Sequence, residues 1–145
     1  MRREMGLLTP DGACRLVNSE ADGLSGLIVD RFSDYLVIQP TSLAVWRRLD
    51  SIASILQAEI RPKGIVLHSD PQINRREGIN AVLQPTWGES PDHAVTILED
   101  GLRFQIDLGQ SQKTGFYLDQ RNNRRAASHY FRGKTVADVC CYSGG

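Results

Sequence analysis

Short apolar runs separated by polar turns predict a strand-rich first part of the chain. The runs at residues 15–18, 27–29, 35–39 and 65–67 contain Val, Ile and Leu, and each is bounded by polar, Gly or Pro residues. Because the polar residues 30–34 separate the second run from the third, this pair predicts a hairpin. We expect the four runs to be strands of one mixed α/β domain.

A second hairpin, over residues 95–108, is the clearest local signal in the sequence. The pair Asp100-Gly101 lies at its centre and suits a two-residue turn. Apolar side chains alternate with polar ones on both sides of this pair, at Val95, Ile97, Leu102, Phe104, Ile106 and Leu108. The polar residues 109–115 that follow are expected to form a loop.

Two segments have helical spacing instead of alternation. Apolar residues recur every three or four positions over 43–56, Ser42 can cap a helix there, and Pro62 lies beyond its end. A second helix is predicted over 120–131, with Asp119 as its N-cap. The apolar face of this second helix comprises Ala126, Ala127, Tyr130 and Phe131.

The last apolar run predicts a buried strand over residues 136–140 that leads to Gly144-Gly145. The two glycines allow a tight turn and a close approach of the backbone to a ligand, as in nucleotide-cofactor loops. Asp138 would then lie beside the loop, where its carboxylate can accept from a ligand amine or orient backbone amides. The alternative is an ordinary turn that Asp138 caps.

These elements predict an α+β fold with a domain boundary near residue 110. A compact mixed α/β domain is expected over 13–110, with irregular polar stretches at 68–80 and 85–91. The first helix and strand of a second domain are expected over 111–145, and residues 1–12 are expected to be the remnant of a preceding segment.

Charge and composition narrow the class of protein. The 17 basic and 17 acidic residues cancel, which argues against a dedicated nucleic-acid-binding domain, although residues 121–134 are locally basic. No apolar run approaches the roughly 20 residues of a membrane span, and no apolar region of a secretory signal follows Met1. The three cysteines include the neighbours Cys140 and Cys141, so we expect reduced thiols and a cytoplasmic protein.

Candidate chemistry is concentrated at the entry to the second helix. Residues 113–122 combine two aromatic side chains with carboxylate, amide and cationic groups, a set that can stack on a purine and hold an anion. A capped helix start with its aromatic residues in the core is the alternative. Arg121, Arg124 and Arg125 can contact phosphates or form a solvated helix face. The scattered histidines predict no metal site, and we expect no catalytic residue in the chain.

Three stretches together resemble the motifs of one methyltransferase family. Residues 16–32 resemble E-x-D-G-L-P-G-hydrophobic-D-R-F, with Ser25 where the family usually has Pro. Residues 113–121 resemble K-T-G-[FY]-[FY]-L-D-Q-R, and residues 136–145 resemble V-L-D-L-F-x-Y-[ST]-G-G-F. The family comprises class I S-adenosylmethionine-dependent 23S ribosomal RNA (cytosine-5) methyltransferases, which have a PUA domain, a middle α/β domain and a Rossmann-like domain.

The resemblance implies site residues in the second and third motifs. The implied contacts to S-adenosylmethionine are Tyr117, Gln120, Arg121, Asp138, Tyr142, Ser143, Gly144 and Gly145. The implied contacts to ribosomal RNA are Lys113, Arg124 and Arg125. In such enzymes the Cys that adds to cytosine C6, the Asp-Pro-Pro-type motif and the carboxylate for the cofactor ribose lie downstream of these motifs.

We therefore expect a fragment of an RNA methyltransferase that is inactive alone. A stand-alone interaction or dimerisation module, or a methyltransferase for a different substrate, are the alternatives. The strand at 136–140 would lack its parallel neighbours, and an unpaired apolar strand promotes association. We therefore expect residues 134–145 to be disordered, to pack on residues 116–131, or to pair with a second copy in a homodimer.

Overall fold

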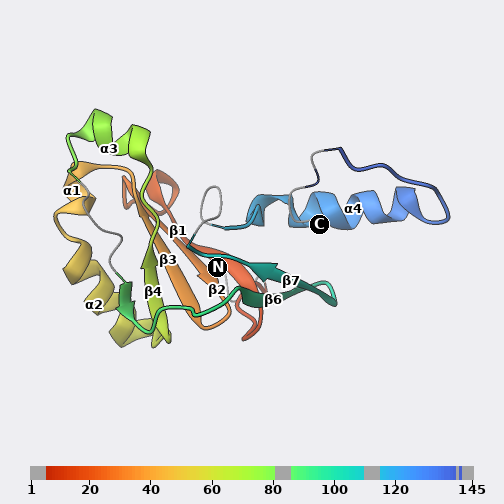
Figure 1. Cartoon of the computed structure of the whole chain (residues 1–145), viewed down its shortest axis with the longest axis horizontal. Coiled ribbons are helices and arrows are strands. Elements are labelled where there is room, and N and C mark those ends of the chain that lie inside the picture. The colour runs from red at the N-terminus through yellow and green to blue at the C-terminus, as the bar shows by residue number, and fades with distance from the viewer. Residues whose placement is uncertain (1–5, 81–85, 110–114, 140, 142–145) are drawn as a thin grey trace.

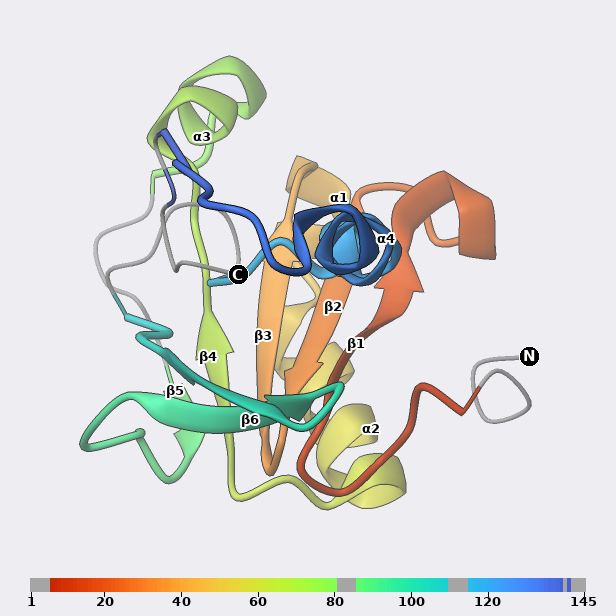
Figure 2. The ribbon, with the colours of Figure 1, turned by 90° about the vertical axis from the view of Figure 1, so that its right-hand side faces the viewer.

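The computed structural model describes residues 6–80, 86–109, 115–139 and 141. In these residues a five-stranded sheet has helices on one face and a two-stranded hairpin on the other, as Figures 1 and 2 show from two directions. The predicted combination of helices and sheets is confirmed.

The order of the sheet follows the order of the chain. Its strands are β1 (Ala13–Asn18), β2 (Leu27–Phe32), β3 (Tyr35–Pro40), β4 (Gly64–Leu67) and β5 (Thr86–Gly88). Strands β3 and β4 pair in parallel, and the other neighbours pair antiparallel. A parallel pair needs a crossover connection, which the helical residues 43–60 supply. The four predicted strands are confirmed, and β5 is an additional strand within a stretch that was predicted to be irregular.

The polar break predicted between the second and third strands is shorter than expected. Strand β2 continues to Phe32, and a turn at Ser33 and Asp34 joins it to β3. Asp30 therefore lies within the strand, where it is wholly buried. Its polar side chain is tolerated because Arg15 lies opposite it in the ladder and forms an ion pair with it.

The helix predicted over 43–56 forms as two helices, α1 (Leu43–Trp46) and α2 (Leu49–Ile60). Ser42 is the cap of α1 as predicted, because its side chain accepts a hydrogen bond from the Val45 amide at 3.4 Å. The break at Arg48, whose φ and ψ of −114° and 9° are not helical, separates the two helices. Both α1 and α2 still contact the same core of the sheet.

Sequence reasoning missed helix α3 (Pro71–Glu77), which lies in the polar stretch 68–80. Asp70 caps this helix, because its Oδ1 accepts from the amides of Gln72 and Ile73 at 2.7 and 3.2 Å. Pro71 occupies the first turn, and Gly78 ends the helix with a φ of 67°. These are the usual start and stop signals of a helix, but the short polar segment between them lacks an apolar period.

The second hairpin is confirmed as β6 (Val95–Glu99) and β7 (Leu102–Ile106), and it covers one face of the sheet. Because side chains alternate along β3, Val37 packs toward the hairpin whereas Leu36 and Ile38 pack toward α2. The core between the sheet and the hairpin also contains Ala13, Phe32, Val66, Val95, Ile97, Phe104, Ile106, Leu108 and Phe116.

The described residues after 115 form a short 3-10 turn, η2 (Leu118–Gln120), and helix α4 (Arg121–Phe131), which extends away from the sheet (Figure 1). Asp119 lies inside η2, so the prediction that it caps the helix is wrong, and Gln120 takes the cap position without a side-chain cap bond. The predicted apolar face of α4 is largely exposed, with Tyr130 at 79% and Phe131 at 49%.

The strand predicted over residues 136–140 does not form in the described part of that segment. Residues 134–139 have no regular secondary structure, and Val139 is 84% exposed. A strand is stabilised by hydrogen bonds to a neighbour, and no strand of the described residues pairs with this segment. The apolar run alone was therefore insufficient to predict a strand.

The turn between β1 and β2 gives a testable pH effect. Hydrogen bonds from Ser19 and Ser25 lower the pKa of the exposed Glu20 to about 2, and the Ser25 hydroxyl lies 2.7 Å from its carboxylate. The Ser25→Ala variant is expected to raise the pKa of Glu20 toward its ordinary value of 4.5, as measured by NMR titration of the carboxyl carbon.

The sign of this effect on stability follows from the lowered pKa. Glu20 stabilises the fold fully above about pH 4.5, and this contribution is lost as the pH falls through about 2. Ser54→Ala is the control, because Ser54 bonds only to a helix carbonyl in the described structure, that of Asp50. An unchanged Glu20 titration in Ser25→Ala would show that the hydroxyl does not control this carboxylate.

Candidate functional site

A pocket of about 460 Å³ lies between β1 and the start of α4, and we call it the β1–α4 pocket. It combines residues that are about a hundred positions apart in the sequence, so the fold and not local structure creates it. Its lining comprises Leu7, Ala13, Cys14, Arg15 and Asn18 on one side and Phe116, Tyr117, Leu118, Asp119, Arg121 and Asn122 on the other.

Arg15 places a positive charge on the β1 side of the pocket. Its Nε and Nη2 atoms donate to the two carboxylate oxygens of Asp30 at 2.8 and 2.9 Å. The hydrogen bond to Asp30 raises the pKa of Arg15, against the opposing effect of burial, and Asp119 across the pocket adds to the increase. The guanidinium is therefore held as a cation whose side chain remains 39% exposed.

Glu99, at the end of β6, forms ion pairs with two arginines of α4. Its Oε2 lies 3.1 Å from Nε of Arg121, and its Oε1 accepts from Nε of Arg124 at 2.8 Å. Nη2 of Arg124 also lies 2.6 Å from the same Oε1. The Glu99 side chain is only 4% exposed, and we call these three residues the Glu99 clasp.

Both arginines of the Glu99 clasp make further bonds to the walls of the pocket. Arg121 Nη2 donates to the Ala13 carbonyl at 2.6 Å, and Arg124 Nη1 donates to the Tyr117 carbonyl at 3.1 Å. The Arg124 guanidinium also lies 4.5 Å from the centre of the Phe116 ring, a cation–π distance. The segment 116–121 is thereby fixed to both β1 and the hairpin.

The structure brings together only part of the predicted cofactor site. Tyr117 and Arg121 both line the β1–α4 pocket. Gln120 does not line it and instead bonds to Asn123 at 2.7 Å, while Asp138 is exposed and also lies outside the lining. The predicted contacts Tyr142, Ser143, Gly144 and Gly145 lie outside the described residues.

The predicted RNA contacts have different surroundings. Arg124 belongs to the Glu99 clasp and its side chain is only 16% exposed, whereas Arg125 is exposed on α4. Lys113 lies outside the described residues. All the assigned cofactor and RNA contacts stay predictions.

Sequence reasoning missed Glu99 and Asp30, the two buried acids of this region. The alternation in β6 places Glu99 on the same face as the buried Val95 and Ile97, which is a signal for an inward carboxylate. A buried carboxylate needs a partner, and the neighbouring arginines of α4 were the available cations. The identity of that partner depends on tertiary structure.

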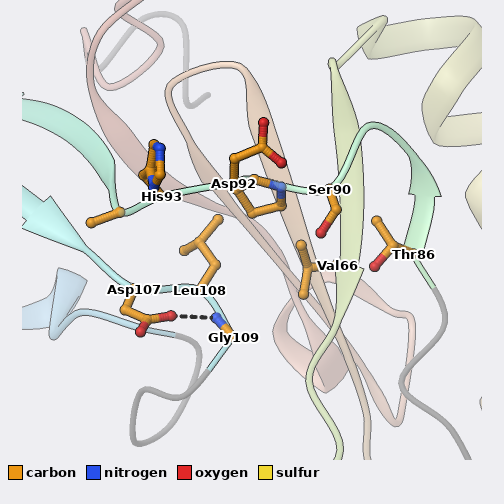
Figure 3. A pocket seen from close by; sticks show the side chains of 10 residues that line it. Val66, Thr86, Ser90, Asp92, His93, Asp107, Leu108 and Gly109 are labelled. Carbon is orange, nitrogen blue, oxygen red and sulfur yellow. Dashed lines mark hydrogen bonds between the residues drawn. The ribbon is translucent and has the colours of Figure 1, made fainter.

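A second pocket of about 240 Å³ lies between the sheet and the hairpin. Figure 3 shows Val66 near its centre, Thr86 and Ser90 on one side, and Asp107 on the other. Asp107 accepts from the Gly109 amide at 2.8 Å, so its carboxylate stabilises the local turn. None of the predicted site residues lines this pocket.

Two further properties hold for the described residues. They contain no group of three or more His, Cys, Asp or Glu side chains arranged to bind a metal ion. Their helices are also too short or too polar to cross a membrane.

Comparisons with known proteins agree with the motif resemblance at the level of the S-adenosylmethionine-dependent methyltransferases. A family model described as S-adenosylmethionine-dependent methyltransferase matches residues 12–145. A ribosomal RNA large subunit methyltransferase I from Aeromonas hydrophila is 39% identical over 132 residues, which cover 90% of this chain and 33% of that protein. The protein with the same name from Shewanella frigidimarina, also a ribosomal RNA large subunit methyltransferase I, is 36% identical over 142 residues, which cover 98% of this chain and 35% of that protein.

The chain thus spans about a third of the length of the curated relatives it matches. Among solved structures, the methyltransferase SMU.776 in complex with SAH superposes with a TM-score of 0.67 at 22% identity. The match covers 85% of this chain and 30% of that one. At this identity the likeness shows a common fold.

Proposed function

Because this chain belongs to the S-adenosylmethionine-dependent methyltransferase family, we propose that it forms part of an enzyme that methylates cytosine C5 in ribosomal RNA of the large subunit. S-adenosylmethionine is the methyl donor of the family. The RNA substrate, the C5 position, a cytoplasmic location and the dependence of activity on further residues of a longer protein are parts of the proposal.

The observation that carries the proposal is the extent of the match. The family model spans both the sheet domain and the segment 115–139, and curated relatives with this match are named as ribosomal RNA methyltransferases. The Glu99 clasp supports the proposal, because it joins the proposed cofactor wall to the hairpin, which belongs to the proposed middle domain, through largely buried ion pairs. A middle domain so joined can help to shape a cleft for RNA.

The described residues fit one wall of a cofactor site. Tyr117 is half-buried, and Arg124 holds its backbone carbonyl, so its ring is presented from a fixed segment. In the proposal Tyr117 and Gln120 contact the cofactor, while Arg121 holds the wall in place through Glu99 and Ala13. S-adenosylmethionine, when bound, supplies an electrophilic methyl group, and Asp138 and residues 142–145 complete its site.

The proposal is tested by binding and by activity. Calorimetric titration with S-adenosylmethionine is expected to show binding to the full-length protein and none to the isolated 145-residue chain. With ribosomal RNA and labelled cofactor, the full-length protein is expected to produce 5-methylcytidine, identified by mass spectrometry of the nucleosides. Cofactor binding without any methylated cytidine would contradict the proposed substrate, and absence of cofactor binding would contradict the proposal as a whole.

A further inference from the structure

We propose that the β1–α4 pocket binds the cytosine base that receives the methyl group, and that Asp119 selects cytosine over uracil there. This inference rests on the proposed function, from which it takes the RNA substrate. It assigns a base-binding role to the junction between the middle domain and α4.

The geometry of methyl transfer supports this pocket as the place for the base. The acceptor atom must lie in contact with the methyl donor, so the base must bind beside the cofactor wall. The β1–α4 pocket opens along the proposed wall at Tyr117 and Arg121, and β1 forms its opposite side. Of the described residues at 134–139 and 141, none lines the pocket.

The lining of the pocket suits an unpaired base. Apolar atoms come from Ala13, Phe116 and Leu118, which match the flat faces of a base. Polar groups on both walls, those of Arg15, Asn18, Asp119 and Asn122, match its hydrogen-bonding edge. The volume of about 460 Å³ falls within the roughly 300–1,000 Å³ of small-molecule sites.

Asp119 carries the selectivity because a carboxylate only accepts hydrogen bonds. Cytosine presents an amino group at C4, which donates to a carboxylate, whereas uracil presents a carbonyl oxygen that a carboxylate repels. Arg15 lies close enough to Asp119 for their charges to interact, so Asp119 lines the pocket near a cation that Asp30 and Asn18 hold in place. Asp119 is exposed, and a long 3.4 Å bond from Gln120 orients one of its oxygens.

The test uses the full-length enzyme and its Asp119→Asn variant. An amide can donate to the uracil oxygen, so the variant is expected to gain activity on RNA with uridine at the target position. Because the amide is a weaker, uncharged acceptor for the cytosine amino group, kcat/KM with cytidine RNA is expected to fall about 10- to 100-fold. The KM for S-adenosylmethionine is expected to stay within about twofold. Asp92→Asn is the matched control, because it changes an exposed aspartate that lies outside the β1–α4 pocket and lines the smaller second pocket instead.

Each outcome has a defined meaning. Unchanged kcat/KM and unchanged selectivity in Asp119→Asn overturn the inference alone. A rise in the KM for S-adenosylmethionine without a change in base preference places Asp119 in the cofactor site and also overturns it. A wild-type enzyme that binds the cofactor but methylates no ribosomal cytidine overturns the proposed function first, and this result is seen without any variant.

Discussion

Replacing Arg15 with methionine is expected to lower the free energy of unfolding by about 3–5 kcal/mol. The variant leaves the wholly buried Asp30 carboxylate without the cation that binds both of its oxygens. Methionine retains most of the apolar stem of arginine, so the loss measures the missing ion pair more than lost packing. Urea denaturation monitored by tryptophan fluorescence gives the change directly.

A double variant separates the two explanations for this loss. Arg15→Met combined with Asp30→Leu removes both charges, and it is expected to recover most of the stability because the buried carboxylate is removed together with its cation. Arg47→Met, at an exposed arginine of the break between α1 and α2, is expected to change the stability by less than about 0.5 kcal/mol. A double variant that is as unstable as the single one would show that Arg15 acts through its packing.

Replacing Glu99 with alanine is expected to cost about 3 kcal/mol and to detach α4 from the hairpin. The Arg121 and Arg124 side chains are only 23% and 16% exposed, so removal of the shared carboxylate leaves two nearly buried cations close together. Because each can still reach some water, the expected loss lies at the low end of the range for buried ion pairs.

Hydrogen exchange distinguishes local release from general destabilisation in this variant. The amides of α4 are expected to exchange faster in Glu99→Ala, whereas those of β2 and β3 retain their protection. Glu99→Gln should lie between the variant and the wild type, because an amide can still accept a hydrogen bond. Glu59→Gln, at an exposed glutamate of α2, is the control, and an equal effect of both glutamine variants would contradict a special role for Glu99.

Local sequence patterns predicted the elements whose stability is mainly local. The hairpin around Asp100-Gly101 was predicted because turn residues and alternation agree, and the four strands of the sheet were found from their apolar runs. Helix α3 was missed despite its Asp70-Pro71 start and Gly78 end, because a short polar helix has no apolar period.

Elements and contacts that depend on distant residues were predicted less well. The run at 136–140 has strand composition, but strand formation requires a hydrogen-bonding neighbour that local sequence cannot specify. The basic cluster on α4 was predicted to contact phosphates or solvent, and the structure shows that Arg121 and Arg124 bind a carboxylate 22 and 25 positions earlier. Alternation along β6 indicates that Glu99 points inward, but only the fold identifies its partners.

The arrangement of the hairpin has a mechanical consequence. Strands β6 and β7 pair with each other and not with the five-stranded sheet, which they contact through apolar side chains. In the described residues one backbone bond, from the Leu98 amide to the Asp11 carbonyl at 2.7 Å, links β6 to the segment before β1. A small sliding of the hairpin would leave both ladders intact but would strain this bond and the bond from Arg121, which Glu99 holds, to the Ala13 carbonyl. These few polar bonds, and not the two ladders, therefore resist sliding at the apolar interface beneath the hairpin.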